Sequence, residues 1–555
     1  MNAEQAPKRS VAEADPSNIW GRPLPPDERA IASEWFRRGN GVGMRGKRRL
    51  TEHGKPQAVV ARDHQPDAGD GETGLLGVAE RPVVVMKLGN AGGAKGPQFK
   101  VNVRSGNSQE IGVSLLPPTK VGKLQATLHD KAKGSPSYRF YALYDKMYRA
   151  DVLWYAFRIC QVNGGAAGVD GQTFEDIEEY GTQKWLGELA EELRTYRYHP
   201  EPVRRVHIPK AGQPGATRPL GIPTIRTRVV MTAVRLVLEP IFEADLQPEQ
   251  YAYRQERSAL DAVQHVRSLL KSRHWEVLDA DLSGYFDSIP HSELLKSVAR
   301  RISDRHVLCL IKMWLQIPVE ETDRRGRKRR TTWNKDKGRG TPQGAPISPL
   351  LSNVYMRRFV LGWKVLGHEH RLQAKIVNYA DDFVICCRRN ADRAMDAMRS
   401  IMQKLKLTIN EEKTHICRIP DESFDFLGYT FGPHYSRRTG RRQITQRPSK
   451  KKIQAICRQI SELTSSRWHR RGVAKQVALL NQTMVGWANY FCQGPVGQPY
   501  RIVTGHACHR LRRWLRAKHK LPGQGISRFP DKYLHDELGL VRLRLRDRNV
   551  PWANS

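Results

Sequence analysis

Two adjacent carboxylates, Asp381 and Asp382, lie between two short apolar runs. Residues 374–377 read Ala-Lys-Ile-Val and residues 383–387 read Phe-Val-Ile-Cys-Cys, which predicts two strands joined by a turn that carries the acids. Paired acids at the end of a buried hairpin are costly unless a positive charge neutralises them. Because divalent hard cations prefer carboxylate oxygens, the pattern predicts a metal site.

A third carboxylate ends another apolar run upstream. Residues 275–280 read Trp-Glu-Val-Leu-Asp-Ala and lead to Asp281. Alternate side chains of a strand share a face, so Asp279 and Asp281 share one, and Asp281 lies at the end that substrate can reach. A polymerase needs two strands that bring carboxylates to one pair of Mg²⁺ ions. We therefore expect Asp281, Asp381 and Asp382 to be the catalytic residues.

An aromatic and an amide side chain are candidates for contact with a nucleotide. Phe286 closely follows Asp281, and a bulky ring there can exclude a 2′-hydroxyl and so select deoxynucleotides. Gln343 lies in the Pro- and Gly-rich run 340–350, and its amide both donates and accepts hydrogen bonds. Taken alone, Phe286 has a core aromatic as its alternative interpretation. The alternative for the Gln343 segment is an ordinary loop before a helix.

Two cations flank a predicted hairpin. Lys210 and Arg218 lie on either side of a turn at residues 212–215, near the two ends of a strand–turn–strand segment. Paired cations over a site neutralise triphosphate charge during phosphoryl transfer. Solvated surface cations are the alternative interpretation.

The charge balance points to a polyanionic partner. Lys and Arg number 93 against 56 Asp and Glu, a net charge of +37 that runs through most of the chain. Nucleic acid is the simplest partner for such an excess. The eight cysteines form no CxxC pair, which is typical of a reduced compartment. The start has no apolar signal segment and no run is long enough to span a membrane, so neither secretion nor membrane insertion is expected.

Composition and periodicity divide the chain into four parts. Residues 1–118 predict a flexible basic extension, with one short amphipathic helix at 27–38. Residues 119–445 mix strand and helix patterns, with a basic run at 324–330 that we expect to touch nucleic acid, a solvated loop being the alternative. Residues 446–520 are helical and basic, and 521–555 form a short basic tail. Helical spacing relates the apolar residues Ile453, Ile456, Ile460, Leu463, Val473, Val477, Leu480 and Met484.

In order along the chain, these segments resemble the sequence blocks of group II intron-encoded reverse transcriptases. The blocks are 168–171, 251–254 with 258–259, 281–287, 341–344, 379–382 in its Tyr-Ala-Asp-Asp form, 409–414 and 424–429, and Lys210 and Arg218 match the fingers. The resemblance implies an α+β right-hand polymerase fold, with fingers and palm containing an antiparallel sheet at 119–445. Residues 479–491 resemble the family's α-helical thumb or X (maturase) domain, which implies that domain at 446–520.

The resemblance also implies an activity and its partners. The protein would be an RNA-directed DNA polymerase that copies intron RNA into DNA for retrohoming and assists splicing as a maturase by binding that RNA. Two Mg²⁺ ions would lie at Asp281, the Leu282 backbone carbonyl, Asp381 and Asp382, while Lys413 and Gly428 would contact primer or template. Partners would be the intron RNA, a DNA target or primer and dNTPs, without a membrane, in the bacterial cytoplasm at the nucleoid. A monomer and a homodimer both stay open.

The alternative function is that of a domesticated relative acting in DNA repair or phage defence.

A further expectation concerns a nuclease domain. Many family members carry a carboxy-terminal HNH nuclease with paired cysteines, and no such pair follows residue 515, so we expect no DNA-cleaving domain in this chain. His506, Cys508 and His509 do not have the spacing of a zinc module, and we expect them to be structural.

Overall fold

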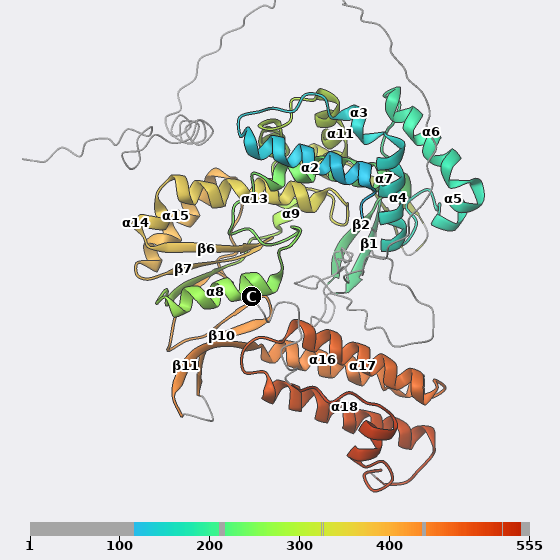
Figure 1. Cartoon of the computed structure of the whole chain (residues 1–555), viewed down its shortest axis with the longest axis vertical. Helices are drawn as coiled ribbons and strands as arrows, with labels where there is room; N and C mark the ends of the chain where they lie inside the picture. The colour runs from blue at the N-terminus through green and yellow to red at the C-terminus, as the bar shows by residue number, and fades with distance from the viewer. Residues whose placement is uncertain are drawn as a thin grey trace, which may run out of the picture. The chain divides into compact units, whose positions relative to one another are not determined.

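The computed structural model describes residues 116–209, 217–323, 325, 327–435, 440–523 and 525–544. All of them belong to one compact unit, Val85–Ser555. The helix expected at 27–38, and nearly all of the basic extension before it and after it, lie outside the described residues. Element labels follow Figure 1.

A four-stranded sheet holds the carboxylate segments, and we call it the central sheet. Its strands are β3 (Glu276–Ala280), β6 (Ala374–Tyr379), β7 (Asp382–Cys387) and β8 (His415–Arg418), in the order β6-β7-β3-β8 with every neighbouring pair antiparallel. Both apolar runs that flank the paired acids are strands, as predicted. Residues 383–387 are all buried, which explains why β7 is apolar on both faces.

Helices cover both faces of the central sheet. In Figure 1, α13 (Ser348–Val365) and α15 (Ala391–Lys404) lie on one side of β6 and β7, and α8 (Ala259–Lys271) lies on the other. In α15, Ala394, Met398 and Ile401 recur at helical spacing and are buried, so one face of the helix packs while the other stays polar. The segments that carry the three carboxylates therefore end on a sheet that is packed on both sides.

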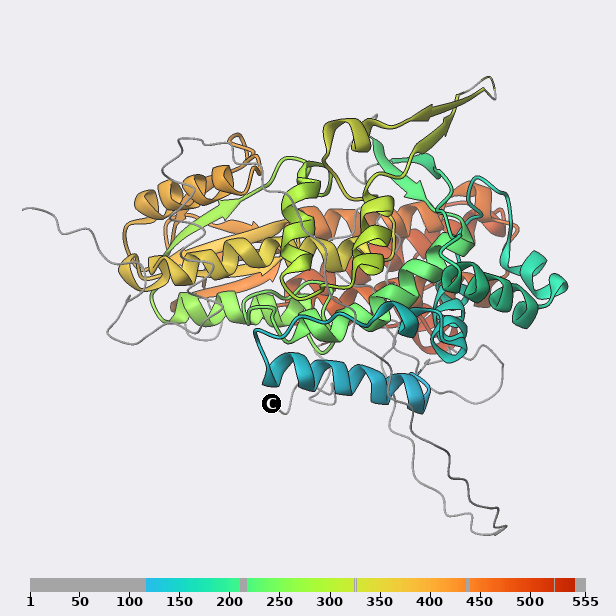
Figure 2. The ribbon, with the colours of Figure 1, turned by 90° about the horizontal axis from the view of Figure 1, so that it is seen from above.

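A second four-stranded sheet contains the predicted hairpin. It comprises β1 (Val203–Pro209), β2 (Thr217–Ile222), β4 (Val319–Thr322) and β5 (Lys328–Thr331), in the order β2-β1-β4-β5. The β1–β2 pair is antiparallel, whereas β1 and β4 run parallel. Part of the basic run, for which a solvated loop was the alternative, is strand β5, and Lys328 and Arg330 pair with Glu320 of the neighbouring strand. Figure 2 shows this β4–β5 hairpin projecting at the upper right.

A three-stranded antiparallel sheet leads into the carboxy-terminal helices. Its order is β11-β10-β9, formed by β9 (Phe424–Phe426), β10 (Tyr429–Tyr435) and β11 (Arg442–Pro448). The chain then forms α16 (Lys450–Leu463), α17 (Val473–Tyr490) and α18 (Gly497–Lys518), with short helical turns at Ser466–Trp468 and Tyr533–Glu537.

The carboxy-terminal helices share one apolar core, as their periodicity predicted. Ile456, Ile460, Val477, Leu480 and Met484 are buried in it, and Ile453, Leu463 and Val473 pack against it from partly buried positions. Cys508 belongs to the same core, with its sulfur 3.4 Å from His535 Nε2.

The remaining helices precede or interrupt the sheets. The most buried of them is α7, which contacts both α2 and α4 and is apolar around most of its circumference. The full set of these helices is α2 (Thr119–Gly134), α3 (Tyr144–Met147), α4 (Ala150–Asn163), α5 (Phe174–Tyr180), α6 (Thr182–Arg194), α7 (Ile225–Glu243), α9 (Tyr285–Ser288), α10 (His291–Ala299), α11 (Arg305–Leu315), α12 (Trp333–Lys337) and α14 (His368–Arg371). The fold thus combines mixed α/β segments and largely antiparallel sheets with a helical region after them. Among the described residues, no helix is long and apolar enough to cross a bilayer.

Candidate active site

The paired acids sit in a tight β-hairpin. Tyr379 pairs with Asp382, so Ala380 and Asp381 alone form the turn between β6 and β7. Ala380 has φ +58°, a left-handed conformation that costs a residue with a Cβ roughly 1–2 kcal/mol. The fully buried side chain of Asn378 donates a hydrogen bond to the Ala380 carbonyl at 2.9 Å and so supports the turn.

The register of the sheet brings Asp281 to the same end as the paired acids. Ala280 pairs with Phe383, so the next step along the antiparallel strands sets Asp281 opposite Asp382. Asp381 is in the adjoining turn, and all three carboxylates are partly exposed. The structure therefore gathers the predicted acids at the ends of two neighbouring strands.

The segment after α15 holds Asp281 from both backbone and side chain. The Asp281 carbonyl accepts a 2.8 Å hydrogen bond from the Asn410 amide, and the Asp281 amide donates to Thr414 Oγ1 at 3.3 Å. On the carboxylate, Oδ2 accepts from Lys413 Nζ at 3.1 Å and from Asn410 Nδ2 at 3.4 Å. Lys413, expected along the primer, thus has a carboxylate partner, and its primer contact stays a prediction.

Leu282 is fixed by the same segment. It pairs with Ile409 in an isolated antiparallel bridge, whose hydrogen bonds use the Asp281 carbonyl and the Ser283 amide. Its own carbonyl as a metal ligand stays a prediction.

The oxygen donors present fit a hard divalent cation. The Asp281 side chain is 29% exposed and already accepts a cationic group, which shows that its carboxylate is accessible to a positive charge. In the described part of the chain, no three His, Cys, Asp or Glu side chains form a ready-made metal cage. Mg²⁺ typically binds one or two carboxylates and takes its other ligands from waters and substrate phosphates, so a pair of strand-end acids is suited to it.

The two residues expected to contact the nucleotide lie on adjoining segments. The Phe286 carbonyl accepts from the Thr341 amide at 2.7 Å, and Gln343 Nε2 donates to Asp287 Oδ2 at 2.8 Å. On its other side the Gln343 carbonyl accepts from the Gly221 amide of β2 at 2.8 Å. The Gln343 loop therefore bridges the segment after β3 and the β1–β2 hairpin.

Gly344 is required for this approach. Its φ is +99°, and a Cβ there would lie 2.5 Å from the Gly221 carbonyl oxygen. Any larger residue would push the Gln343 loop away from β2.

Only one of the two predicted cations lies among the described residues. Lys210 lies outside the described residues. Arg218 is in β2 opposite Ile208, and its backbone is described. The roles of both side chains remain predictions.

A buried polar network supports β6 behind the hairpin. The Asn378 amide donates to the Glu249 carbonyl at 2.9 Å, and the Tyr251 amide donates to the Asn378 carbonyl at 3.0 Å. The segment that makes these bonds is anchored by Arg254, which contacts the Glu243 carboxylate at 2.6 Å and the Gln250 carbonyl at 2.8 Å.

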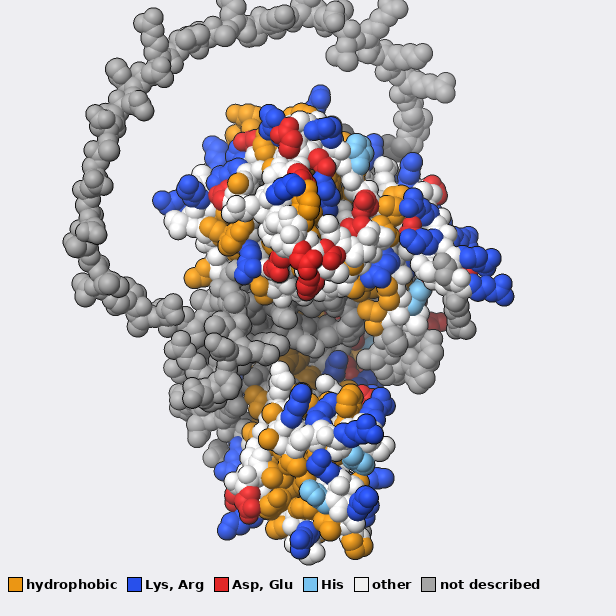
Figure 3. Space-filling model, turned by 90° about the vertical axis from the view of Figure 1, so that its right-hand side faces the viewer, with side chains coloured by type: hydrophobic (Ala, Val, Ile, Leu, Met, Phe, Trp, Pro, Cys, Tyr) orange, Lys and Arg blue, Asp and Glu red, His pale blue; other side chains and the backbone are white. Residues whose placement is uncertain are grey.

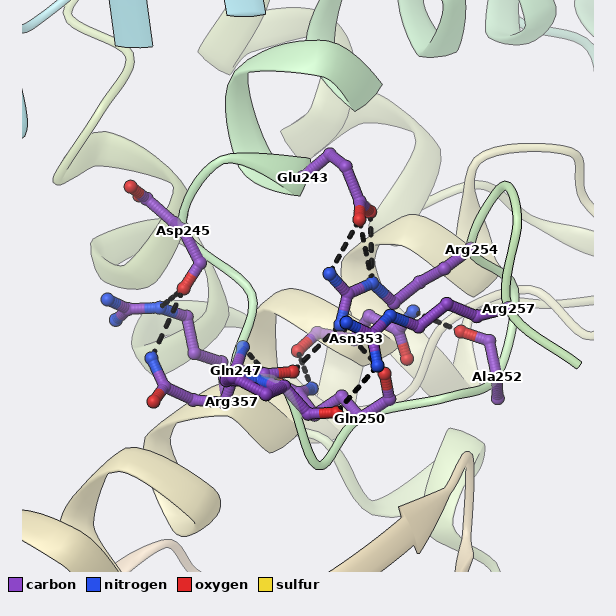
Figure 4. A network of polar contacts seen from close by, with 10 residues as sticks. Glu243, Asp245, Gln247, Gln250, Ala252, Arg254, Arg257, Asn353 and Arg357 are labelled. Atoms are coloured by element: carbon purple, nitrogen blue, oxygen red, sulfur yellow. Dashed lines mark hydrogen bonds and ion pairs between the residues drawn. The ribbon is translucent and has the colours of Figure 1, made fainter. Parts of the chain in front are cut away.

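Helix α13 contributes to the same network. Asn353 Nδ2 donates to the Ala252 carbonyl at 2.7 Å, and Gln250 Nε2 donates to the Asn353 carbonyl at 3.1 Å. Figure 4 shows Arg254 lying between Glu243 and the backbone near Gln250. Block 251–254, seen in the sequence only as a resemblance, therefore braces the strand that carries the paired acids.

Gly428 lies where the three-stranded sheet meets the carboxy-terminal helices. Its φ is +82°, and a Cβ there would lie 3.1 Å from Lys452 Cε and 3.3 Å from Phe491 Cζ. Its carbonyl accepts a 2.9 Å hydrogen bond from the Ser449 amide, just before α16. Tyr490 Oη donates to the neighbouring Leu427 carbonyl at 2.8 Å. The turn has a packing role that the sequence did not reveal, and its primer contact stays a prediction.

Two tyrosines near Asp382 are neutral groups. Burial raises the pKa of Tyr379, and the nearby Tyr253 and Asp382 raise it further. Burial likewise raises the pKa of Tyr490, again with Asp382 as a contributor. These phenols stay protonated at neutral pH and add no negative charge to the site.

Sequence reasoning missed several supporting residues. Asn378, Asn410 and Thr414 all hold the acids, yet none was assigned a role. Only Asn378 carried a signal, because it is a polar residue in the middle of an apolar strand. Asn410 and Thr414 act through contacts distant in the sequence, which no local pattern indicates.

Two family patterns match this chain. The reverse transcriptase (RNA-dependent DNA polymerase) family matches residues 208–431, and the group II intron, maturase-specific domain matches residues 453–530. The first match contains all three carboxylates and the Gln343 loop. The second covers most of α16, α17 and α18.

Curated relatives come from bacteria, yeasts and a plant. Protein YkfC of Escherichia coli is 32% identical over a match that covers 60% of this chain and 93% of that protein. The group II intron-encoded protein LtrA of Lactococcus lactis is 28% identical, covering 52% of this chain and 56% of its own length. The putative COX1/OXI3 intron 1 protein of Saccharomyces cerevisiae is 26% identical, with 51% and 38% covered. With a reverse transcriptase region followed by a maturase-specific region, this chain belongs to the family of group II intron-encoded reverse transcriptases and maturases.

Proposed function

We propose that this protein copies group II intron RNA into DNA for retrohoming and also binds that RNA to assist splicing. The observation that carries the proposal is the meeting of Asp281 and Asp382 at the ends of antiparallel strands, beside a Gln343 loop. The maturase-specific match supports the splicing role. Two of the named relatives, LtrA and the COX1/OXI3 intron 1 protein, are intron proteins by name, so the domesticated alternative is not favoured.

In this proposal the fold is that of a right-hand polymerase. Residues 119–445 form fingers and palm, and residues 446–520 form a thumb. Asp281, Asp381 and Asp382, with the Leu282 carbonyl, would hold two Mg²⁺ ions. When bound, the ions would activate the primer 3′-hydroxyl and stabilise the leaving pyrophosphate.

The protein's own residues position the nucleotide. Lys210 and Arg218 would neutralise the triphosphate, and Phe286 would exclude a ribose 2′-hydroxyl. Gln343 is held by Asp287 and Gly221, so its loop is a fixed wall against the sugar and base. Lys413 and Gly428 would face the primer. The substrates would be dNTPs and a DNA primer or target, and the working location would be the bacterial nucleoid.

Primer extension on an annealed RNA template tests the catalytic assignment. With Mg²⁺ and dNTPs we expect long products from the wild type and loss of at least about a thousandfold in rate for Asp381→Ala, since catalysis would lose a metal ligand. Asp421→Ala is the matched control, because its side chain is 85% exposed and remote from the strand ends in sequence. Equal activity of Asp381→Ala and wild type would reject the metal site.

RNA binding by the same variants separates the two roles. Asp381→Ala should bind intron RNA as tightly as the wild type, because the substitution removes no phosphate contact. Filter binding measures this directly. Parallel loss of RNA affinity and synthesis would show that Asp381 supports the fold rather than the chemistry.

A further inference from the structure

A cavity of about 470 Å³ lies apart from the carboxylates. Its walls come from the start of α10, the end of α11, α12 with the residues after it, and Lys406 beyond α15. None of Asp281, Phe286, Gln343 or the paired acids lines it. Its volume is within the range of about 300–1,000 Å³ that holds small organic ligands.

Four cations line this cavity, and no carboxylate does. They are Lys312, Lys337, Arg339 and Lys406. In the described part of the chain, none of the four has a carboxylate partner, whereas Lys328, Arg330 and Lys413 are all paired with acids. Concentrated, unbalanced positive charge in a concave site favours an anion.

The central cation is held in place. The Arg339 guanidinium donates to the Lys406 carbonyl at 3.2 Å and to the Ser288 carbonyl at 3.4 Å. These bonds orient the guanidinium without neutralising it. A planar, oriented guanidinium is well suited to a phosphate.

An exposed aromatic ring adjoins the cationic wall. Trp333 begins α12 and is 43% exposed, and Lys337 Nζ lies 4.9 Å from its ring centroid. Lys337 therefore links the ring to the cavity. Proteins that bind single-stranded nucleic acid combine this pair of features, with cations on the backbone and an aromatic ring under a base.

We propose that this cavity binds one phosphate of a single-stranded nucleic acid, with a neighbouring base stacked on Trp333. The proposed site consists of Lys312, Lys337, Arg339 and Lys406, with Trp333 beside them. RNA and single-stranded DNA share the required chemistry, and the test separates them. The site adds a nucleic-acid contact to the proposed function, and it does not depend on polymerisation.

The location links the site to the strand ends through the backbone. Arg339 is followed by Gly340 and Thr341, whose amides donate to the Ile289 and Phe286 carbonyls. Lys406 precedes the segment whose Asn410 holds Asp281. A bound strand would therefore lie behind the walls of the active site rather than in it.

The first experiment measures how binding depends on salt. Full-length protein is titrated with a labelled single-stranded oligoribonucleotide of about 12 nucleotides, in EDTA and without dNTPs, so that polymerase failure does not affect the result. For single strands the slope of log K against log salt changes by about 0.7 per phosphate contact. Because the site holds one phosphate, the double variant Lys312→Ala/Lys337→Ala should have a slope shallower by up to about 0.7.

A matched pair of lysines is the control. Lys123→Ala/Lys184→Ala also removes two exposed lysines from helices, and Lys184 lies 4.4 Å from the ring centroid of exposed Tyr180, as Lys337 lies over Trp333. The control slope should equal that of the wild type. An equal change in both double variants would overturn the proposal, because it would mean non-specific attraction alone.

The second experiment tests the aromatic contact and the nature of the ligand. Trp333→Ala should weaken oligoribonucleotide binding by roughly tenfold at a salt concentration that suppresses backbone contacts, while Trp333→Phe retains affinity. Tyr180→Ala is the control, since that ring is 48% exposed and also lies under a lysine. No difference between Trp333→Ala and Tyr180→Ala would reject the stacking contact.

Competition identifies the source of the phosphate. A 4-thiouridine oligoribonucleotide should photocross-link to the 333–337 segment, and unlabelled single-stranded RNA or DNA should compete, the stronger competitor being the natural ligand class. Displacement by inorganic pyrophosphate or a dNTP at concentrations where neither strand competes would overturn the proposal in favour of a free-phosphate site.

Discussion

At the residue scale, Lys413 places a positive charge beside the Asp281 carboxylate. Its ammonium is 3.1 Å from the Asp281 carboxylate, and the Lys413 side chain is 67% exposed. A cation at this position satisfies the carboxylate but repels any metal ion that the same carboxylate binds. The charge of Lys413 would therefore lower the affinity of this carboxylate for a divalent metal ion.

Lys413→Met should lower the Mg²⁺ concentration that gives half-maximal primer extension. Removing a unit charge next to a divalent ion should produce a shift of roughly three- to tenfold in the presence of salt screening. The measurement is a Mg²⁺ titration of the extension rate, with Lys413→Arg as the control that retains the charge. A higher Mg²⁺ requirement, or a change confined to primer affinity, would instead assign Lys413 to the primer.

Residue chemistry could be predicted at the strand ends because the acids break an apolar pattern. Asp281 follows one apolar run and Asp382 precedes another, and the sheet register then sets them opposite each other. Asn410 and Thr414 could not be predicted, since their contacts with Asp281 span more than a hundred residues and lack any local periodicity.

At the scale of elements, the Leu427–Gly428 turn joins sheet to helix. Both residues have positive φ, and the turn receives hydrogen bonds from Tyr490 of α17 and from Ser449 before α16. Burial of Phe491 and Tyr429 around it makes the junction part of an apolar cluster. The orientation of the carboxy-terminal helices therefore depends on this turn, in which only glycine fits well at position 428.

Gly428→Ala should destabilise this junction. The left-handed backbone costs roughly 1 kcal/mol for a residue with a Cβ, and the close contacts with Lys452 and Phe491 should add about 1–2 kcal/mol. Urea unfolding measures the change. Gly171→Ala isolates the backbone cost, because Gly171 has φ +74° and no atom lies within 4 Å of the position that its new methyl group would take. Equal losses in the two variants would remove the packing argument.

Individual strands and helices could be predicted from local sequence patterns more reliably than the pairing between them. The hairpins at β1–β2 and β6–β7 and the core of α16 and α17 have clear periodicity in the sequence. The parallel pairing of β1 with β4 has no such signal, because it joins segments that are far apart in the chain. Strand β5 lacks a clear signal for a different reason, because it consists mostly of cations, and it forms a short local hairpin with β4 in which Glu320 pairs with Lys328 and Arg330.

At the scale of the whole molecule, positive charge is distributed rather than confined. On the face drawn in Figure 3, Lys and Arg side chains occur in every part of the described surface, while acidic side chains gather in fewer patches. A net charge of +37 is suited to a polyanionic partner of matching extent. Long RNA offers such a surface, whereas a single nucleotide does not.

Affinity for intron RNA should fall steeply with salt. Binding through six to ten phosphates would weaken by about 10³- to 10⁵-fold between 50 and 200 mM monovalent salt. Filter binding across that range gives the slope, and Asp381→Ala should have the same slope as the wild type because it keeps every cation. A shallow slope would mean that few phosphates are contacted and that shape or base contacts dominate.

The turn between β6 and β7 contains only Ala380 and Asp381, and this length has a consequence for how the gene can change. Side chains of a strand alternate between faces, so a one-codon insertion or deletion in the turn would slip the register and exchange the faces of every residue in β7. After an insertion, Asp382 would take the environment that now belongs to Phe383, which is completely buried. The register of the hairpin therefore constrains the number of residues between Tyr379 and Phe383 more strictly than composition alone would.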